Sequence, residues 1–199
     1  MTSRMAHLLG ELRREMNGAV VGSMRYYGKE YGLNYGVSIP TIRSLGRTET
    51  KDNRYAKYLF RQEVRELRLV SLWFAEADLV AEDLPFWARG IINSEVAEEA
   101  AFILFSKVPE VVEWLDSKDE VLQYCAVMAI AGSDKINLCA MKPQLLNLLG
   151  SNPALLPKAV IVLLESALKQ SSEGVKQFLD EMPTNEACNN IREEMVWRM

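Results

Sequence analysis

Apolar residues recur every three or four positions along almost the whole chain, and short polar or Gly/Pro links separate the apolar segments. This spacing is the period of an amphipathic α-helix. The sustained apolar–polar alternation that would indicate β-strands does not occur in the sequence. The pattern therefore predicts an all-α protein.

Capping residues and prolines predict where the helices begin. Residues 4–16 form a first amphipathic helix, and a second one runs through Met24, Tyr27 and Tyr31. Ser38 can cap a helix whose first turn holds Pro40, where the missing N–H costs nothing. Further helices are expected to begin near residues 52–53, 64, 83–85, 93–94, 109, 117–119, 157, 171–172 and 185, and Pro143 either opens a helix or lies within one.

The later helices alternate between a short one and a longer, more apolar one, about every 35–40 residues. Irregular antiparallel pairs at this period are typical of HEAT-like repeats. We expect an α-α superhelix, a solenoid of about six such pairs, forming a single domain over residues 1–199. A compact irregular bundle is the alternative, and it is less favoured because no helix carries a long heptad stripe.

The net charge of −4 hides an asymmetry. Residues 1–70 carry 13 Lys/Arg against 7 Asp/Glu, whereas residues 71–199 carry 10 against 20. A basic segment on an acidic protein is a candidate site for an anionic partner. The alternative is that the basic and acidic faces pair with each other inside one domain.

Basic residues between positions 43 and 68 recur at helical spacing. On a continuous helix those after position 53 would form one stripe, suited to contacts with successive phosphates. Alternatively, Glu63 and Glu66 neutralise part of the stripe, and Arg65 or Arg68 belongs to a buried pair. The predicted DNA-binding residues are Arg43, Arg47, Arg54, Lys57, Arg61, Arg65 and Arg68.

Several classes of protein are excluded or disfavoured. His7 is the only histidine, which argues against a Ser/His/Asp triad or a two-histidine metal site. No glycine pattern for nucleotide binding occurs either. From these two observations we expect no metal and no cofactor. Three cysteines without C-x-x-C spacing fit the reducing cytoplasm. No apolar run approaches the roughly 18–20 residues that span a membrane.

Four segments carry a resemblance to a known family. They are YGVSIPTIR at 35–43, QEVRELRLVSLWF at 62–74, INSEVAEEAAFIL at 92–104 and PKAVIVLLESALK at 157–169. With them the chain resembles the DNA alkylation repair enzyme family, the alkylpurine DNA glycosylases built from HEAT-like repeats. The resemblance implies a solenoid whose basic concave face grips double-stranded DNA.

The resemblance also implies chemistry, namely hydrolysis of the N-glycosidic bond of positively charged alkylated purines by an Asp framed by tryptophans and an Arg. In this chain the Asp position falls on Glu98 and the preceding aromatic position on Ser94. The Arg position falls on Tyr124 and the late Trp position on Val162. Two functions follow as hypotheses. One is binding of duplex DNA, with glycosylase activity through Glu98, and the other is a non-catalytic scaffold that binds a protein partner.

Overall fold

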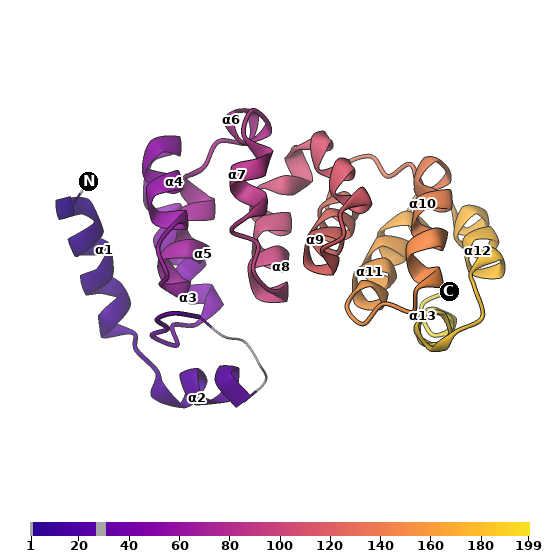
Figure 1. Cartoon of the computed structure of the whole chain (residues 1–199), viewed down its shortest axis with the longest axis horizontal. Helices are drawn as coiled ribbons and strands as arrows, with labels where there is room; N and C mark the ends of the chain where they lie inside the picture. Colours follow the sequence, from indigo (N-terminus) through magenta and orange to yellow (C-terminus); the bar gives the residue numbers. More distant parts are fainter. Residues whose placement is uncertain (1, 27–30) are drawn as a thin grey trace. The chain divides into compact units, whose positions relative to one another are not determined.

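The computed structural model describes residues 2–26 and 31–199, and it divides into two compact units, residues 1–99 and 100–199 (Figure 1). The predicted all-α class is confirmed. Over the described residues the regular structure is helical, and one parallel β-bridge joins Leu33 to Val64. The assignment of residues 1–199 to a single domain stays a prediction.

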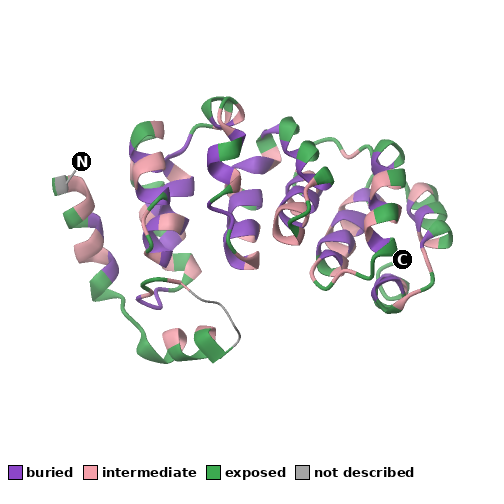
Figure 2. Ribbon diagram, viewed as in Figure 1, coloured by how far each residue is buried: buried purple, intermediate pink, exposed green. Residues whose placement is uncertain are grey.

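In the first unit, α3 and α4 pack against α5, which is buried along most of its length (Figure 2). The rings of Tyr55 and Phe74 stack between α4 and α5 with centroids 5.6 Å apart. The helices of this unit are α1 (Thr2–Arg14), α2 (Gly18–Tyr26), α3 (Ile39–Arg47), α4 (Asn53–Phe60), α5 (Arg65–Phe74), α6 (Ala77–Ala81), α7 (Leu84–Ala88) and the first turns of α8 (Ser94–Ile103).

In the second unit, α9 and α11 form the centre, and α11 also contacts α12 and α13. Val160, Leu163 and Leu164 of α11 are fully buried, as its nearly all-apolar sequence requires. No helix among the described residues is long and apolar enough to cross a membrane. The helices are η1 (Phe105–Lys107), η2 (Pro109–Asp116), α9 (Glu120–Ala131), α10 (Leu138–Gly150), α11 (Leu156–Leu168), α12 (Ser172–Glu181) and α13 (Glu186–Val196).

The predicted helix starts are largely confirmed, because they depend on local chemistry. The Ser38 hydroxyl accepts the backbone N–H of Thr41 at 3.2 Å, and Pro40 lies in the first turn of α3. Asp52 caps α4 in the same way. Other side-chain caps are Asn93, Asp119, Ser171 and Asn185.

Two expectations about helices are wrong. The segment that begins at Pro109 forms the 3₁₀ helix η2 instead of an α-helix. The second helix ends at Tyr26 and does not continue through Tyr31, whereas Tyr27 lies outside the described residues. Tyr31 is non-helical because the chain directly after it, at Leu33, pairs with the segment before α5.

Gly46 provides a test of the packing between α3 and α5. A Cβ atom at Gly46 would lie 2.4 Å from Cγ of Trp73, whereas nothing lies within 4 Å of a Cβ at Gly10 in α1. We expect Gly46→Ala to lower the free energy of unfolding by about 1–3 kcal/mol through overpacking. Gly10→Ala should raise it by up to about 1 kcal/mol through helix propensity. Urea denaturation measures both, and equal effects would contradict the close approach.

Candidate functional site

The predicted stripe of basic side chains is interrupted in the structure. α4 ends at Phe60 and α5 begins at Arg65. Between them Val64 forms the β-bridge with Leu33, and the N–H of Arg65 donates to the Leu33 carbonyl at 2.9 Å. This pairing uses backbone groups that a continuous helix would need for its own ladder. The basic residues therefore do not lie on one continuous helix, and the condition for a single stripe is not met.

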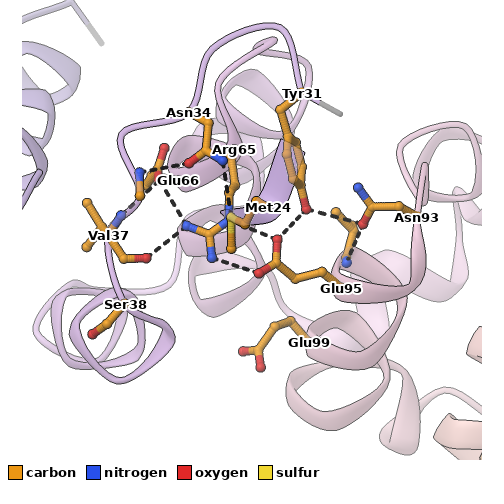
Figure 3. Close-up of polar contacts among 12 residues, drawn as sticks. Met24, Tyr31, Asn34, Val37, Ser38, Arg65, Glu66, Asn93, Glu95 and Glu99 are labelled. Carbon is orange, nitrogen blue, oxygen red and sulfur yellow. Dashed lines mark hydrogen bonds and ion pairs between the residues drawn. The ribbon is translucent and has the colours of Figure 1, made fainter. Parts of the chain in front are cut away.

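Arg65 is a buried structural residue, with an exposed fraction of 1%. Figure 3 shows its guanidinium between the carboxylates of Glu66 and Glu95. Its Nε and one terminal nitrogen donate to both carboxylate oxygens of Glu95, at 2.8 and 2.7 Å. The other terminal nitrogen donates to Glu66 at 2.9 Å and to the Val37 carbonyl at 2.8 Å. The prediction that Arg65 contacts DNA is wrong, because its guanidinium is enclosed and its donors are engaged within the protein.

Glu66, also buried, ties the same cluster to the loop before α3. Its carboxylate accepts the backbone N–H of Tyr35 at 3.1 Å and that of Val37 at 3.2 Å. Gly36 between them has a φ of 73°, and a Cβ there would lie 2.1 Å from the Asn17 carbonyl oxygen. Only glycine fits this turn. The distinctive stretch at residues 35–43 therefore serves to position α3 against α5.

Tyr31 and Asn93 complete the cluster at the start of α8. The Tyr31 hydroxyl donates to Glu95 and lies 3.2 Å from Oδ1 of Asn93, the residue that caps α8 through the N–H of Val96. Burial, followed by the charge of Glu95 and the hydrogen bond to it, raises the pKa of Tyr31. Burial lowers the pKa of Arg65, but the hydrogen bonds and charges of Glu95 and Glu66 raise it overall.

The three carboxylates of α8 are not equivalent. Glu95 pairs with Arg65, and Glu99 accepts Nε and a terminal nitrogen of Arg43 at 3.1 and 2.6 Å. The hydrogen bond to Glu99 raises the pKa of Arg43 despite its partial burial. Glu98, the predicted catalytic residue, is half-buried and follows Glu95 by three positions on the helix. Two of the three carboxylates are therefore committed to arginines of the same unit.

The other predicted DNA-binding residues differ in how far they are engaged. Lys57 forms an ion pair with Asp83 at 2.7 Å, which lowers the pKa of that carboxyl group. Arg47 is exposed, and its guanidinium carbon lies 5.0 Å from the ring centroid of Trp73. Arg54 is exposed at the start of α4. Arg47 and Arg54 therefore present charge to solvent, whereas Lys57 is largely neutralised.

Arg61 and Arg68 meet a third arginine that the sequence pattern misses, Arg89. The three side chains line a pocket of about 370 Å³ together with Phe60, Phe86 and Gly90. Arg89 follows α7 and stands outside the helical spacing of the stripe. The sequence signal that could have found it is its isolation, since it is the only basic residue between positions 69 and 106. We call these three side chains the arginine pocket.

The remaining positions implied by the resemblance lie in both units. Ser94 is the first residue of α8 in the first unit. In the second unit Tyr124 is buried in α9, with an exposed fraction of 1%, and Val162 is half-buried in α11. None of the three can supply the cation or the tryptophans that the resemblance implies.

The sequence profile of the DNA alkylation repair enzyme family matches residues 8–194. The chain belongs to this family. No curated protein sequence matches the chain. Membership therefore comes from the profile, and the motifs that carried the resemblance lie within the matched range.

A solved structure shows the fold independently. It is described as representing "a new family of proteins related to the HEAT-like repeat DNA glycosylases with affinity for branched DNA structures". The two structures align with a TM-score of 0.71 over 96% of this chain and 94% of the other, at 11% sequence identity. The prediction of an all-α solenoid of HEAT-like repeats is thereby confirmed.

The cluster around Arg65 predicts a large loss of stability when its cation is removed. Arg65→Ala leaves two buried carboxylates, Glu66 and Glu95, without their counter-ion. Breaking a buried pair from one side costs about 3–5 kcal/mol. Arg61→Ala is the matched control, because Arg61 is exposed and should change stability by no more than about 0.5 kcal/mol. Similar urea midpoints for the two variants would contradict the structural role of Arg65.

Proposed function

We propose that this protein binds double-stranded DNA through exposed arginines of its first unit, without excising bases. Residues 1–99 carry 14 Lys/Arg and 14 Asp/Glu, so the unit has no excess of positive charge as a whole. The supporting observation is how those charges are distributed. Of the residues predicted to bind DNA, Arg43, Lys57 and Arg65 are paired internally. The others form no ion pair among the described residues, and we assign Arg47, Arg54 and the arginine pocket to the basic surface.

A basic surface of this kind suits the DNA backbone. Each phosphate that a Lys or Arg neutralises releases a condensed counterion, and this release supplies much of the binding free energy. Such contacts position a protein on DNA without reading its sequence. Membership in a DNA alkylation repair family supports DNA as the anionic partner, as does the affinity for branched DNA ascribed to the family of the structural relative.

Salt dependence tests DNA binding. We expect the wild type to bind a labelled linear duplex with an affinity that falls as the salt concentration rises. Arg47→Glu combined with Arg54→Glu should reduce the slope of log K against log[salt] by roughly 2, about one per phosphate contact. Fluorescence anisotropy at several salt concentrations measures this, with a four-way junction as a second substrate.

Lys118→Glu combined with Lys135→Glu is the matched control. Both lysines are exposed, lie in the second unit, and give the same change in net charge. The control should leave the slope near the wild-type value. Binding that does not respond to salt, or an equal loss in the two double variants, would argue against the proposed surface.

Glycosylase activity through Glu98 is the second candidate. The observation that favours it is that Glu98 is half-buried and so partly accessible, whereas Glu95 and Glu99 on the same helix are buried. Against it, a Glu carries one methylene more than the Asp of the family pattern, and positioned chemistry tolerates little displacement. Ser94, Tyr124 and Val162 also lack the groups expected to frame the reaction.

Release of methylated purine from alkylated duplex DNA decides between binding and catalysis. We expect the wild type to release no more base than Glu98→Gln, because the framing cation and tryptophans are replaced. The measurement is chromatography of the released bases over an extended incubation. Release by the wild type that is lost in Glu98→Gln would establish the glycosylase instead.

A protein-binding scaffold remains the alternative from another class. An apolar pocket of about 500 Å³ in the second unit favours it, with walls that include Phe105, Val111 and Ile130. Binding of neither linear nor branched DNA would favour the scaffold function.

We also propose a cytoplasmic location for the protein. The three free thiols of Cys125, Cys139 and Cys188 fit a reducing compartment.

A further inference from the structure

We propose that the arginine pocket of Arg61, Arg68 and Arg89 binds a phosphomonoester, the group found at the end of a DNA strand or on a free mononucleotide. For the strand end, the inference rests on the proposed function in DNA binding. It goes beyond that function because it assigns one pocket and one chemical group, where the basic surface needs only backbone contacts.

The pocket gathers positive charge that no ion pair within the described part of the chain neutralises. None of the described carboxylates forms an ion pair with Arg61, Arg68 or Arg89. Two carboxyl groups, those of Glu63 and Asp83, interact with these arginines through charge without forming an ion pair with them. Asp83, which feels the charge of Arg89, is paired with Lys57, and the exposed Glu63 lines a neighbouring recess that shares Arg68. Three guanidiniums therefore face one opening without an ion-pair partner among residues 2–26 and 31–199.

Arg68 carries the strongest argument for an anion. Its side chain is half-buried, and burial lowers its pKa, an effect that electrostatic interactions with Tyr31 and Glu63 offset only in part. Its terminal nitrogens donate to the carbonyl oxygens of Gly90 at 2.9 Å and Gln62 at 3.3 Å. Those carbonyls hold the guanidinium in place but bring no full negative charge. An anion would offset the cost of removing this cation from water.

Aromatic rings form one wall of the pocket. Phe60 packs at 4.8 Å from Trp87 and 6.1 Å from Phe86, measured between ring centroids. The guanidinium carbons of Arg61 and Arg68 lie 4.9 Å from the Phe86 centroid and 5.7 Å from the Phe60 centroid. Ion pairs formed against such a wall are stronger than in open water, because the local dielectric is lower.

Gly90 is required at the edge of this wall. A Cβ atom at Gly90 would lie 2.1 Å from Cε1 of Phe60, so no other residue allows the backbone to come this close. The close approach brings the Gly90 carbonyl within reach of Arg68. Glycine at this position therefore links the aromatic wall to the orientation of the guanidinium.

The charge of the pocket selects the type of phosphate. An internal phosphodiester carries one negative charge, whereas a phosphomonoester carries about 1.5 to 2 at pH 7 and has three acceptor oxygens. Guanidinium forks bind such oxygens in pairs. Three cations match the terminal group better than the internal one. The volume of about 370 Å³ exceeds one phosphate and leaves room for part of the attached sugar.

The test compares short duplexes that carry phosphates at their 5′ ends, at their 3′ ends or at neither. We expect the wild type to bind one phosphorylated duplex about tenfold more tightly than the unphosphorylated one, the effect of about one charge-assisted contact. Arg61→Gln combined with Arg89→Gln should abolish this preference, so that the three duplexes bind with equal affinity, apart from any loss of affinity that all three share. Both residues are exposed, so thermal denaturation should show a folded protein.

Arg47→Gln combined with Arg54→Gln is the matched control, with the same loss of charge outside the pocket. It should weaken the binding of all three duplexes and keep their ratio. Equal affinity of the wild type for the three duplexes would overturn the strand end as the ligand of the pocket and leave the DNA-binding function standing. A preference that survives in Arg61→Gln/Arg89→Gln would also overturn that assignment.

Deoxyadenosine monophosphate, titrated by calorimetry, separates the two sources of phosphate. Binding by the wild type that is lost in Arg61→Gln/Arg89→Gln supports the pocket even if no duplex binds, and in that case only the DNA-binding function fails. If neither the mononucleotide nor a phosphorylated end is preferred over its unphosphorylated counterpart, the pocket has no phosphate function.

Discussion

The first unit depends on one buried cation, the guanidinium of Arg65. A charge removed from water is tolerated only when partners compensate it, and here Glu66 and Glu95 do so from two different helices. One cation and two carboxylates leave an excess of negative charge. The N–H groups of Tyr35 and Val37 and the hydroxyl of Tyr31 donate to the carboxylates and stabilise that excess (Figure 3). Three segments that are distant in sequence thereby acquire one relative arrangement.

This cluster also decides which charged residues remain available for a partner. Once α8 is held by Arg65, its last carboxylate within the unit, Glu99, lies against Arg43 on α3 and neutralises it. The carboxylates of Glu95 and Glu99 on α8 are thus neutralised by arginines of the same unit. The positive charge left over lies elsewhere, in the arginine pocket between the end of α4, the first turns of α5 and the end of α7.

The pairing of α8 carboxylates with arginines also limits the catalysis that this helix can support. A carboxylate that stabilises developing positive charge in a substrate must not already be neutralised by an arginine. Glu95 and Glu99 do not meet this condition. The scaffold of a DNA alkylation repair protein is therefore present in a chain whose α8 carboxylates largely serve structure.

Local features of this protein follow from its sequence alone. The all-α class and the helix caps at Ser38 and Asp52 depend on interactions between residues a few positions apart. The spacing of residues along the sequence is enough to predict such interactions. The roles of the arginines cannot be predicted in this way. Arg61 and Arg65 are four positions apart and alike in sequence, yet one is exposed and one is buried. The difference arises from the bridge at Leu33, which ends α4 early, and from α8, about 30 residues away in sequence.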